Sequence, residues 1–263
     1  MRASKHSALG NDFIVVDDAD APDGADWPSL AIRWCGGNPG ADGLITFRRT
    51  SEHSMTMLLH NRDGSRAEMS GNGIRCLVQA ASMRWGHMGR QNYEVSTDAG
   101  LRTVAIDDAG SADTCASVGM GEVRPLPEPR GWSDLQCDPA RPVLHLSLGN
   151  PHSVVGVENV RDVPLARLGE LVPQVNLEVV EQGPGTSEVT MRVHERGAGI
   201  TAACGTGACA SAWAARAWGL VAGSAVTVRM DGGNVQVRLD DPTPGSVTLV
   251  GPTRLVSEHE LVP

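Results

Sequence analysis

Two short segments of the sequence carry residue types suited to proton chemistry, and they share one layout. Each has a small residue with an O–H or S–H group, then Gly-x-Gly, then a helix-forming run; the first residue is Ser70 in one segment and Cys204 in the other. Glycines let a backbone approach a ligand closely, and a helix N-terminus offers unpaired N–H groups to an anion. We therefore expect Cys204 to have a lowered pKa and to be partly thiolate near neutral pH.

The chemistry that such a pair could perform is the exchange of a proton on opposite faces of one carbon. Two thiols placed this way would form a two-base device, which the inversion of an amino acid without a cofactor requires. This sequence has one Cys and one Ser at the two positions. A helix terminus can bring a thiol into the working range, whereas an aliphatic hydroxyl is far less acidic, so Ser70 is not expected to act as a base unaided.

The elements around these segments predict an α+β fold. Short β-like runs recur at short intervals, and such spacing favours hairpins over βαβ crossovers. They are 12–17, 43–48, 54–60, 93–97, 101–106, 114–118, 143–148, 153–157, 175–180, 188–194, 225–230, 234–239 and 246–250, and the expected helices are 28–35, 72–85, 163–171 and 207–220.

Because the device occurs once in each half, we expect two pseudo-symmetric domains. Each would be a curled, mainly antiparallel β-sheet or barrel around a central helix that begins at the device. The expected domains are residues 1–113 and 114–251, with 252–263 as a segment that can return to the first.

Composition excludes several classes of protein. The 263 residues are 41% hydrophobic and 20% charged, with a net charge of −9 and no basic run, which argues against nucleic acid and anionic membranes as partners. Residues 200–223 are the most apolar stretch, but their Gly, Ala, Ser and Thr content and Arg216 indicate a buried helix rather than a membrane span.

The six cysteines do not form a dense disulfide framework, and the N-terminus lacks the apolar core of a secretory signal. We therefore expect a cytoplasmic protein. Cys204 and Cys209, with His152 and His194, could be imagined as zinc ligands, but no second Cys pair has ligand spacing, so no metal site is predicted.

Polar residues at turns complete a candidate binding site for a small molecule. Asparagines follow strand-like runs at several places, and Glu195 and Arg196 lie just before Cys204. Amides, one carboxylate and one guanidinium are the groups needed to hold a zwitterion. Singly, each Asn is more often a turn former than a ligand group.

These motifs, taken together, resemble the diaminopimelate epimerase family. The matching strings span the chain in the family's order: residues 8–13 (ALGNDF), 61–65 (NRDGS), 68–76 (EMSGNGIRC), 149–152 (GNPH) and 195–208 (ERGAGITAACGTGA). The resemblance implies two pseudo-symmetric domains and an enzyme that interconverts LL- and meso-diaminopimelate through two cysteines, without metal or pyridoxal phosphate. A homodimer is left open.

By the same resemblance, Cys204 is one catalytic residue and Ser70 occupies the place of the other. The backbones of Gly71-Asn72 and Gly205-Thr206 would bind the carboxylate at the reacting carbon. The side chains implied in holding the substrate are those of Asn11, Asn61, Asn150, Asn176, Glu195 and Arg196, with Arg196 and three asparagines on the distal carboxylate.

Ser70 is the one departure from the family pattern, because the family has its first catalytic cysteine there. Three explanations stay open: an engineered Cys→Ser change that traps substrate, a natural serine in a racemase or dehydratase of altered specificity, or a non-catalytic homologue that binds an amino acid. We expect impaired epimerisation in the first case. Cys76, six residues further on, is expected to be a buried apolar residue rather than a substitute nucleophile.

Overall fold

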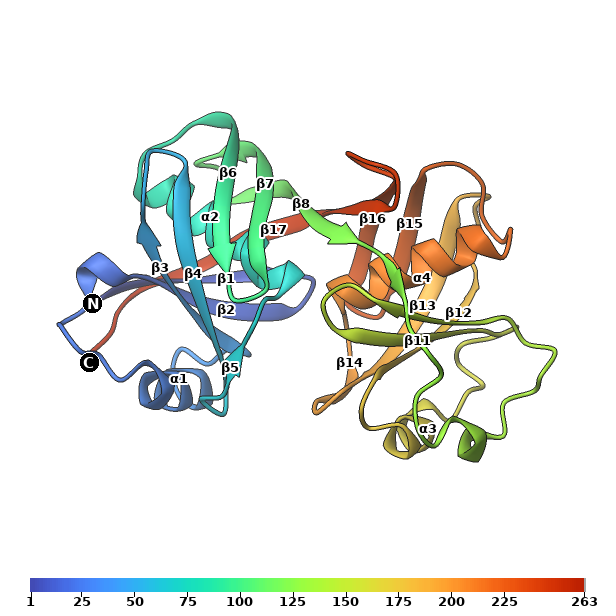
Figure 1. Ribbon diagram of the computed structural model, residues 1–263. Helices are drawn as coiled ribbons and strands as arrows, with labels where there is room; N and C mark the ends of the chain where they lie inside the picture. Colours follow the sequence, from blue (N-terminus) through green and yellow to red (C-terminus); the bar gives the residue numbers. More distant parts are fainter. Residues whose placement is uncertain (263) are drawn as a thin grey trace. The chain divides into compact units, whose positions relative to one another are not determined.

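The computed structural model describes residues 1–262 as two compact units (Figure 1). Unit 1 comprises Met1–Val118 and the segment that begins at Gly251, and unit 2 comprises Gly119–Val250. The sequence places the boundaries after residues 113 and 251, and in the structure they follow residues 118 and 250. Pro263, the last residue of the predicted returning segment, lies outside the described residues.

Unit 1 is a curled sheet whose strand pairs close into a ring. Its strands are β1 (Arg2–Ala8), β2 (Asn11–Asp17), β3 (Gly43–Arg49), β4 (Ser54–Asn61), β5 (Arg66–Ala67), β6 (Gly89–Thr97), β7 (Gly100–Ala109), β8 (Asp113–Glu122) and the last part of β17 (Ser246–Glu260). From β1 the pairing runs through β2, β3, β4, β6 and β7 to β8, and β17 pairs with both β8 and β1. The eight strands form a mainly antiparallel barrel, as expected.

The helix α2 (Gly71–Arg84) lies inside this barrel and contacts β1, β2, β3 and β7 (Figure 1). All residues from Gly71 to Ser82 are buried. A helix buried on every side is fixed by packing all round, so its N-terminus has a defined position in unit 1. The other helices of the unit, η1 (Asp18–Asp20) and α1 (Trp27–Gly36), are peripheral, and α1 buries Leu30 and Trp34 in a separate small core.

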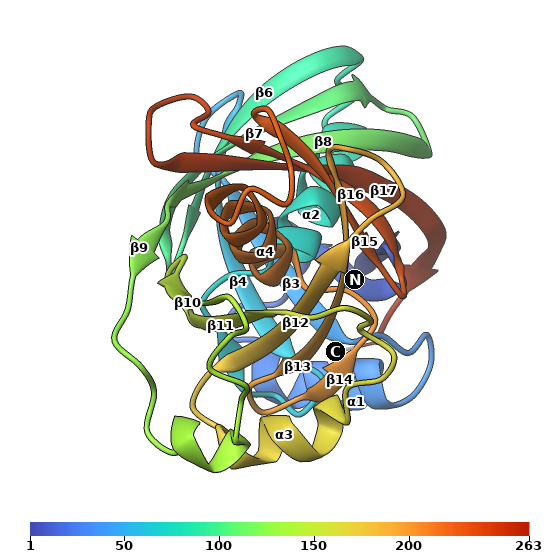
Figure 2. The same ribbon diagram turned by 90° about the vertical axis from the view of Figure 1, so that its right-hand side faces the viewer.

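Unit 2 repeats this plan. Its strands are β9 (Arg124–Pro125), β10 (Val143–Ser147), β11 (Pro151–Gly156), β12 (Asn176–Gln182), β13 (Glu188–Glu195), β14 (Gly199–Thr201), β15 (Ala225–Met230), β16 (Gly233–Leu239) and the first part of β17. Its helices are η2 (Trp132–Leu135), α3 (Leu165–Leu171) and α4 (Gly205–Ala217). Figure 2 shows α4 among the strands, where it contacts β10 to β13, β15 and β16.

The apolar stretch 200–223 forms β14, α4 and the turn that follows, with Ala208–Ala212 buried. The prediction of a buried helix is therefore confirmed. Among residues 1–262, no helix is long and apolar enough to cross a membrane.

Most neighbouring strands are antiparallel, as the strand spacing favours, but crossovers are also present. Each unit contains two parallel strand pairs: β2–β3 and β4–β6 in unit 1, β11–β12 and β13–β15 in unit 2. A helix connects each pair, in the order α1, α2, α3 and α4. The sheet stays mainly antiparallel because β10–β11, β12–β13 and β15–β16 are hairpins or antiparallel neighbours, as are β1–β2, β3–β4 and β6–β7. In both units the second crossover helix begins at one of the two devices.

Gly169 of α3 lies in a tightly packed part of unit 2. A Cβ added to Gly169 would lie 2.1 Å from Cγ and 2.2 Å from Nδ1 of His194, whereas one added to Gly36 of α1 would meet nothing within 4 Å. Gly169→Ala should therefore lower the free energy of unfolding by about 1 to 3 kcal/mol. Gly36→Ala, the matched control, should change it by less than about 0.5 kcal/mol. Equal effects in denaturant titrations would contradict this packing.

Candidate active site

Ser70 is the N-cap of α2. Its backbone is extended, with φ −133° and ψ 126°, and its Oγ accepts the N–H of Gly73 at 3.0 Å. Serine is among the preferred N-cap residues, and this bond satisfies one of the unpaired N–H groups of the first turn. Ser70 therefore points its hydroxyl oxygen at the positive end of a buried helix.

Cys204 occupies the same position on α4. Its φ is −129° and its ψ 114°, and its Sγ accepts the N–H of Gly207 at 3.4 Å. The hydroxyl of Thr206 lies 3.5 Å from the same sulfur. The two segments are thus one structural device in each unit, with oxygen in one copy and sulfur in the other.

The second glycine of each device packs closely against neighbouring residues of its own unit. A Cβ at Gly207 would lie 2.7 Å from Oε1 of Glu178 and 3.2 Å from Sγ of Cys204. A Cβ at Gly73 would lie 3.1 Å from a methyl of Ile45 and 3.2 Å from Cβ of Ser70. Close approach of the cap and its neighbours therefore explains these glycines, beside the approach to a ligand that the sequence suggested.

Unit 1 brings three of the predicted binding residues to Ser70. Gly71 and Asn72 form the first turn of α2, and Asn72 donates to Oδ1 of Asn11 at 3.4 Å. The buried guanidinium of Arg75 donates to Asn72 Oδ1 at 2.8 Å and to the Gly71 carbonyl at 2.9 Å. Asn61, at the end of β4, donates instead to Ser65 in its own turn, at 3.0 Å.

Unit 2 brings two groups of predicted residues to one end of β11, β12 and β13. Asn150 donates to the hydroxyl of Thr206 at 3.2 Å, which ties it to the device around Cys204. Asn176 accepts the backbone N–H of Arg196 at 2.8 Å. Glu195, the residue before Arg196, accepts a hydrogen bond from Thr201 across β13 and β14.

A buried pair behind Cys204 extends this network. His152 and Glu178 are both 0% exposed, and His152 Nδ1 lies 2.7 Å from Glu178 Oε1. His152 Nε2 lies 3.0 Å from Oδ1 of Asn150. The sequence showed His152 only in its turn motif and as an imagined zinc ligand, and Glu178 was not among the predicted site residues. Its place within an apolar strand run was the available signal, because a carboxylate there needs a partner.

The expected lowering of the Cys204 pKa is wrong for this structure. Burial raises the pKa of the thiol well above its usual range, and the carboxylates of Glu195 and Glu178 raise it further. The hydrogen bonds from Thr206 and Gly207 act in the opposite direction but are weaker. Cys204 is thus a protonated thiol near neutral pH, because the loss of water costs the anion more than the helix end returns. Burial likewise raises the pKa of Cys76 to about 12, as suits an inert cysteine.

Three side chains of unit 1 outside the predicted site have metal-ligand types. Glu52, His53 and His87 each offer an atom within 4.8 Å of the other two. The two imidazoles are stacked, with centroids 5.0 Å apart and planes inclined by 28°, and His87 also stacks on Tyr93. In the structure a nitrogen of each imidazole already has a partner, His53 Nε2 with Gln91 Oε1 at 3.0 Å and His87 Nδ1 with the Tyr93 hydroxyl at 2.8 Å.

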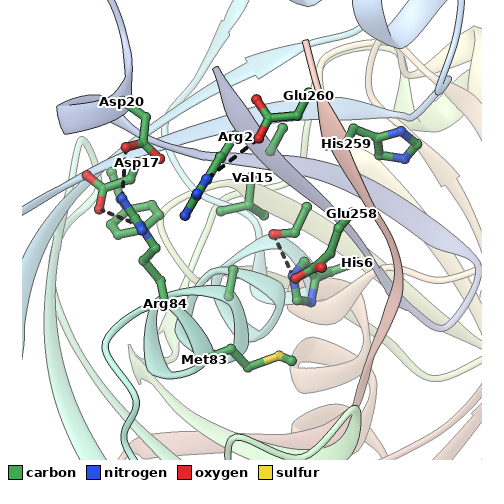
Figure 3. Close-up of a pocket in the computed structure, with 14 residues that line it drawn as sticks. Arg2, His6, Val15, Asp17, Asp20, Met83, Arg84, Glu258, His259 and Glu260 are labelled. Carbon is green, nitrogen blue, oxygen red and sulfur yellow. Dashed lines mark hydrogen bonds and ion pairs between the residues drawn. The ribbon is translucent and has the colours of Figure 1, made fainter.

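A cavity of about 590 Å³ opens elsewhere in unit 1, beside β1, the end of β17 and the end of α2 (Figure 3). Two arginines that line it form ion pairs within the unit, Arg84 with Asp20 at 2.8 Å and Arg2 with Glu260 at 3.6 Å. At its floor His6 is buried, and burial lowers its pKa to about 4. None of the predicted site residues lines this cavity.

Solved structures share this fold over the whole chain. A phenazine biosynthesis protein of the PhzF family from Bacillus anthracis superposes with a TM-score of 0.79 and 14% identity, covering 100% of this chain and 99% of that one. A hydroxyproline epimerase from Agrobacterium vitis gives 0.69 and 15%, covering 99% and 90%. The fold is therefore that of the class to which PhzF-like proteins and proline-type epimerases belong.

Sequence comparison narrows the class to one family. The diaminopimelate epimerase family model matches residues 3–126 and 145–256. Diaminopimelate epimerases from Heliobacterium modesticaldum and Bacteroides thetaiotaomicron are 37% and 33% identical; the matches cover 99% of this chain in both cases, and 99% and 98% of those relatives. The chain belongs to the diaminopimelate epimerase family and is an isomerase of the epimerase type.

The two second glycines give a test of the device in unit 2. Gly207→Ala should destabilise the protein by about 1 to 3 kcal/mol, because the new methyl group meets a buried carboxylate that cannot move without losing His152. In Gly73→Ala the new methyl group meets the end of a flexible Ile45 side chain, so the loss of unfolding free energy should be smaller. Replacing a helical glycine with alanine also stabilises the helix by about 0.5 to 1 kcal/mol, which offsets this loss. Thermal unfolding of both variants measures the difference. A Gly207→Ala protein as stable as the parent would show that Glu178 does not occupy this space.

Proposed function

We propose that the chain catalyses the epimerisation of LL-diaminopimelate to meso-diaminopimelate, and that Ser70 makes this reaction slow. The reaction would serve the supply of lysine and of peptidoglycan precursors. It would proceed by two-base proton exchange without metal or pyridoxal phosphate, in the cytoplasm. Free thiols at Cys35, Cys76, Cys115, Cys137 and Cys204 support a reducing compartment for this role.

The observation that carries the proposal is the matched geometry of Ser70 and Cys204. Both cap the N-terminus of a buried crossover helix, with φ within a few degrees of each other and the same bond from the third helical N–H. One such cap would explain anion binding alone. Two of them, each with a proton-bearing side chain, support a reaction in which a proton leaves one face of a carbon and returns to the other.

Cys204 has the protonation state of the acid in this exchange. Its pKa is raised by burial, so near neutral pH it carries a proton that it can deliver to the α-carbon. The base on the other face would then be residue 70. A serine hydroxyl holds its proton too tightly for that role, so the chain has an acid without an effective partner.

The predicted binding residues have contacts that suit a substrate with charged ends. The free N–H groups of Gly71-Asn72 and Gly205-Thr206 lie in the first turns of α2 and α4, where a carboxylate is stabilised. Asn176 fixes the backbone of Arg196, and Asn11 holds Asn72. In the proposal, Arg196 with Asn61, Asn150 and Asn176 holds the distal carboxylate, and Glu195 completes the site.

Ser70→Cys tests the proposal. The change replaces one oxygen with sulfur at an N-cap and supplies the missing thiol, so the rate of epimerisation should rise by about 10² to 10⁴-fold. The parent should epimerise poorly. Because Cys204 is protonated near neutral pH, exchange of the α-proton with D₂O should be slow, confined to the stereoisomer whose proton faces Cys204, and faster as the pH rises and the thiol ionises. Chiral chromatography measures epimerisation, and NMR measures exchange.

Cys76→Ser is the matched control, since it alters a buried cysteine of the same helix and should leave the rate unchanged in either background. A parent that is already fully active, or a Ser70→Cys variant with an unchanged rate, would contradict the two-thiol mechanism. Elimination of water from a hydroxy amino acid would then be the reaction to assay.

A further inference from the structure

A hydrogen-bond chain leads from the interior of unit 2 to the sulfur of Cys204. It starts at Glu178 on β12, passes through His152 on β11 and Asn150 just before that strand, and reaches the sulfur through Thr206 in the first turn of α4. The successive distances are 2.7, 3.0, 3.2 and 3.5 Å. Figure 2 shows α4 beside β11 and β12, the parallel strands on which His152 and Glu178 lie.

The direction of these bonds follows from their atoms. An amide oxygen only accepts, so His152 Nε2 must carry a proton to bond Oδ1 of Asn150. A second proton then lies between His152 Nδ1 and Glu178 Oε1, on one atom or the other. In both arrangements the His152–Glu178 pair is neutral overall.

Burial favours this neutral pair over the alternative, in which an ionised Glu178 faces a neutral His152. The amide of Asn150 could face the other way only if His152 gave its single proton to the bond with an ionised Glu178, which would leave a net negative charge with no exposure. The second carboxylate oxygen of Glu178 is buried and has no hydrogen-bond partner among residues 1–262, so an anion there would be poorly stabilised. Burial accordingly raises the pKa of Glu178.

The neutral state of the His152–Glu178 pair affects Cys204 through Asn150 and Thr206. With its oxygen held by His152, Asn150 donates through Nδ2 to the hydroxyl of Thr206. That hydroxyl has its own hydrogen left to direct at Cys204 Sγ when the sulfur becomes a thiolate. The sulfur then accepts two bonds, from Thr206 and from the N–H of Gly207.

We propose that Glu178 is a positioning residue for Cys204. The proton that Glu178 shares with His152 orients the hydrogen bonds through Asn150 so that Thr206 donates to the thiolate. This inference rests on the proposed function, in which Cys204 exchanges a proton with the substrate. Glu178 touches neither substrate nor sulfur and acts only through His152, Asn150 and Thr206.

The opposite expectation follows if Glu178 acts as a nearby charge alone. A carboxylate raises the pKa of Cys204, so its removal would lower that pKa and make the sulfur more reactive. Under the proposal, removal takes away a donor to the thiolate and makes the sulfur less reactive. The sign of the change therefore separates the two accounts.

Glu178→Met in the full-length protein is the first test, because Met retains the volume and removes the shared proton. The rate of alkylation of Cys204 by iodoacetamide at fixed pH is measured by mass spectrometry of its peptide. The alkylation rate should fall by about three- to tenfold, because it follows the fraction of Cys204 that is thiolate. A less acidic thiol gives a more nucleophilic thiolate, which offsets part of this fall. Glu181→Gln, on the same strand but bonded to the Val160 backbone, is the control and should leave the rate unchanged.

A double-mutant cycle tests whether Glu178 acts through Thr206. Thr206→Val should slow alkylation to a similar degree, Thr206→Ser should restore it, and Glu178→Met should add little to Thr206→Val. An unchanged or faster rate in a folded Glu178→Met protein, or additive effects in the double variant, would overturn the proposal. If Glu178→Met melts before the assay temperature, an unchanged rate in Thr206→Val overturns it alone. No substrate is used, so a failure here is separate from a failure of Ser70→Cys.

Discussion

The arrangement on which the rest of this structure depends is a side chain that caps a buried helix. Each unit curls a sheet around one helix, and the first N–H groups of that helix need acceptors where water has little access. Ser70 and Cys204 each supply one, to Gly73 and Gly207. The same atoms that complete the helix are those with proton chemistry, so fold and candidate site share their contacts.

At such a cap the helix end lowers the pKa of a thiol, whereas burial raises it, and the helix end does not always prevail. The helix end stabilises a thiolate, but it does so over a short distance and with partial charges. At Cys204 burial and two carboxylates outweigh it, so the resting state is the thiol. In the proposed reaction, a thiol that keeps its proton would serve as the proton donor, and residue 70 would have to serve as the base.

The sequence predicted most of the fold because its signals were local. The Gly-x-Gly turns marked the starts of α2 and α4, and β-branched runs marked most strands. It missed β1, since Arg2–Ala8 contains no β-branched residue and becomes a strand by pairing with β2 and β17. The parallel crossovers were missed because strand spacing alone does not show that α1 or α3 joins two neighbouring strands.

The candidate site was less accessible to sequence reasoning. Motif positions named the caps and the asparagines, but Glu178 looked like one residue of an ordinary strand, and its importance appears only through its contact with His152. The Cys204 pKa was predicted in the wrong direction because burial at a position and carboxylates from other strands cannot be read from the helix start. Long-range contacts decide both points.

The central claim is that the two caps act together on one substrate. A crystal structure of the protein with meso-diaminopimelate bound tests it most directly. The account predicts the α-carbon between Ser70 Oγ and Cys204 Sγ, each about 3 to 3.5 Å away, with its carboxylate on the N–H groups of α2 and α4. A ligand that contacts one cap only, or that binds at the cavity of Figure 3, would contradict it.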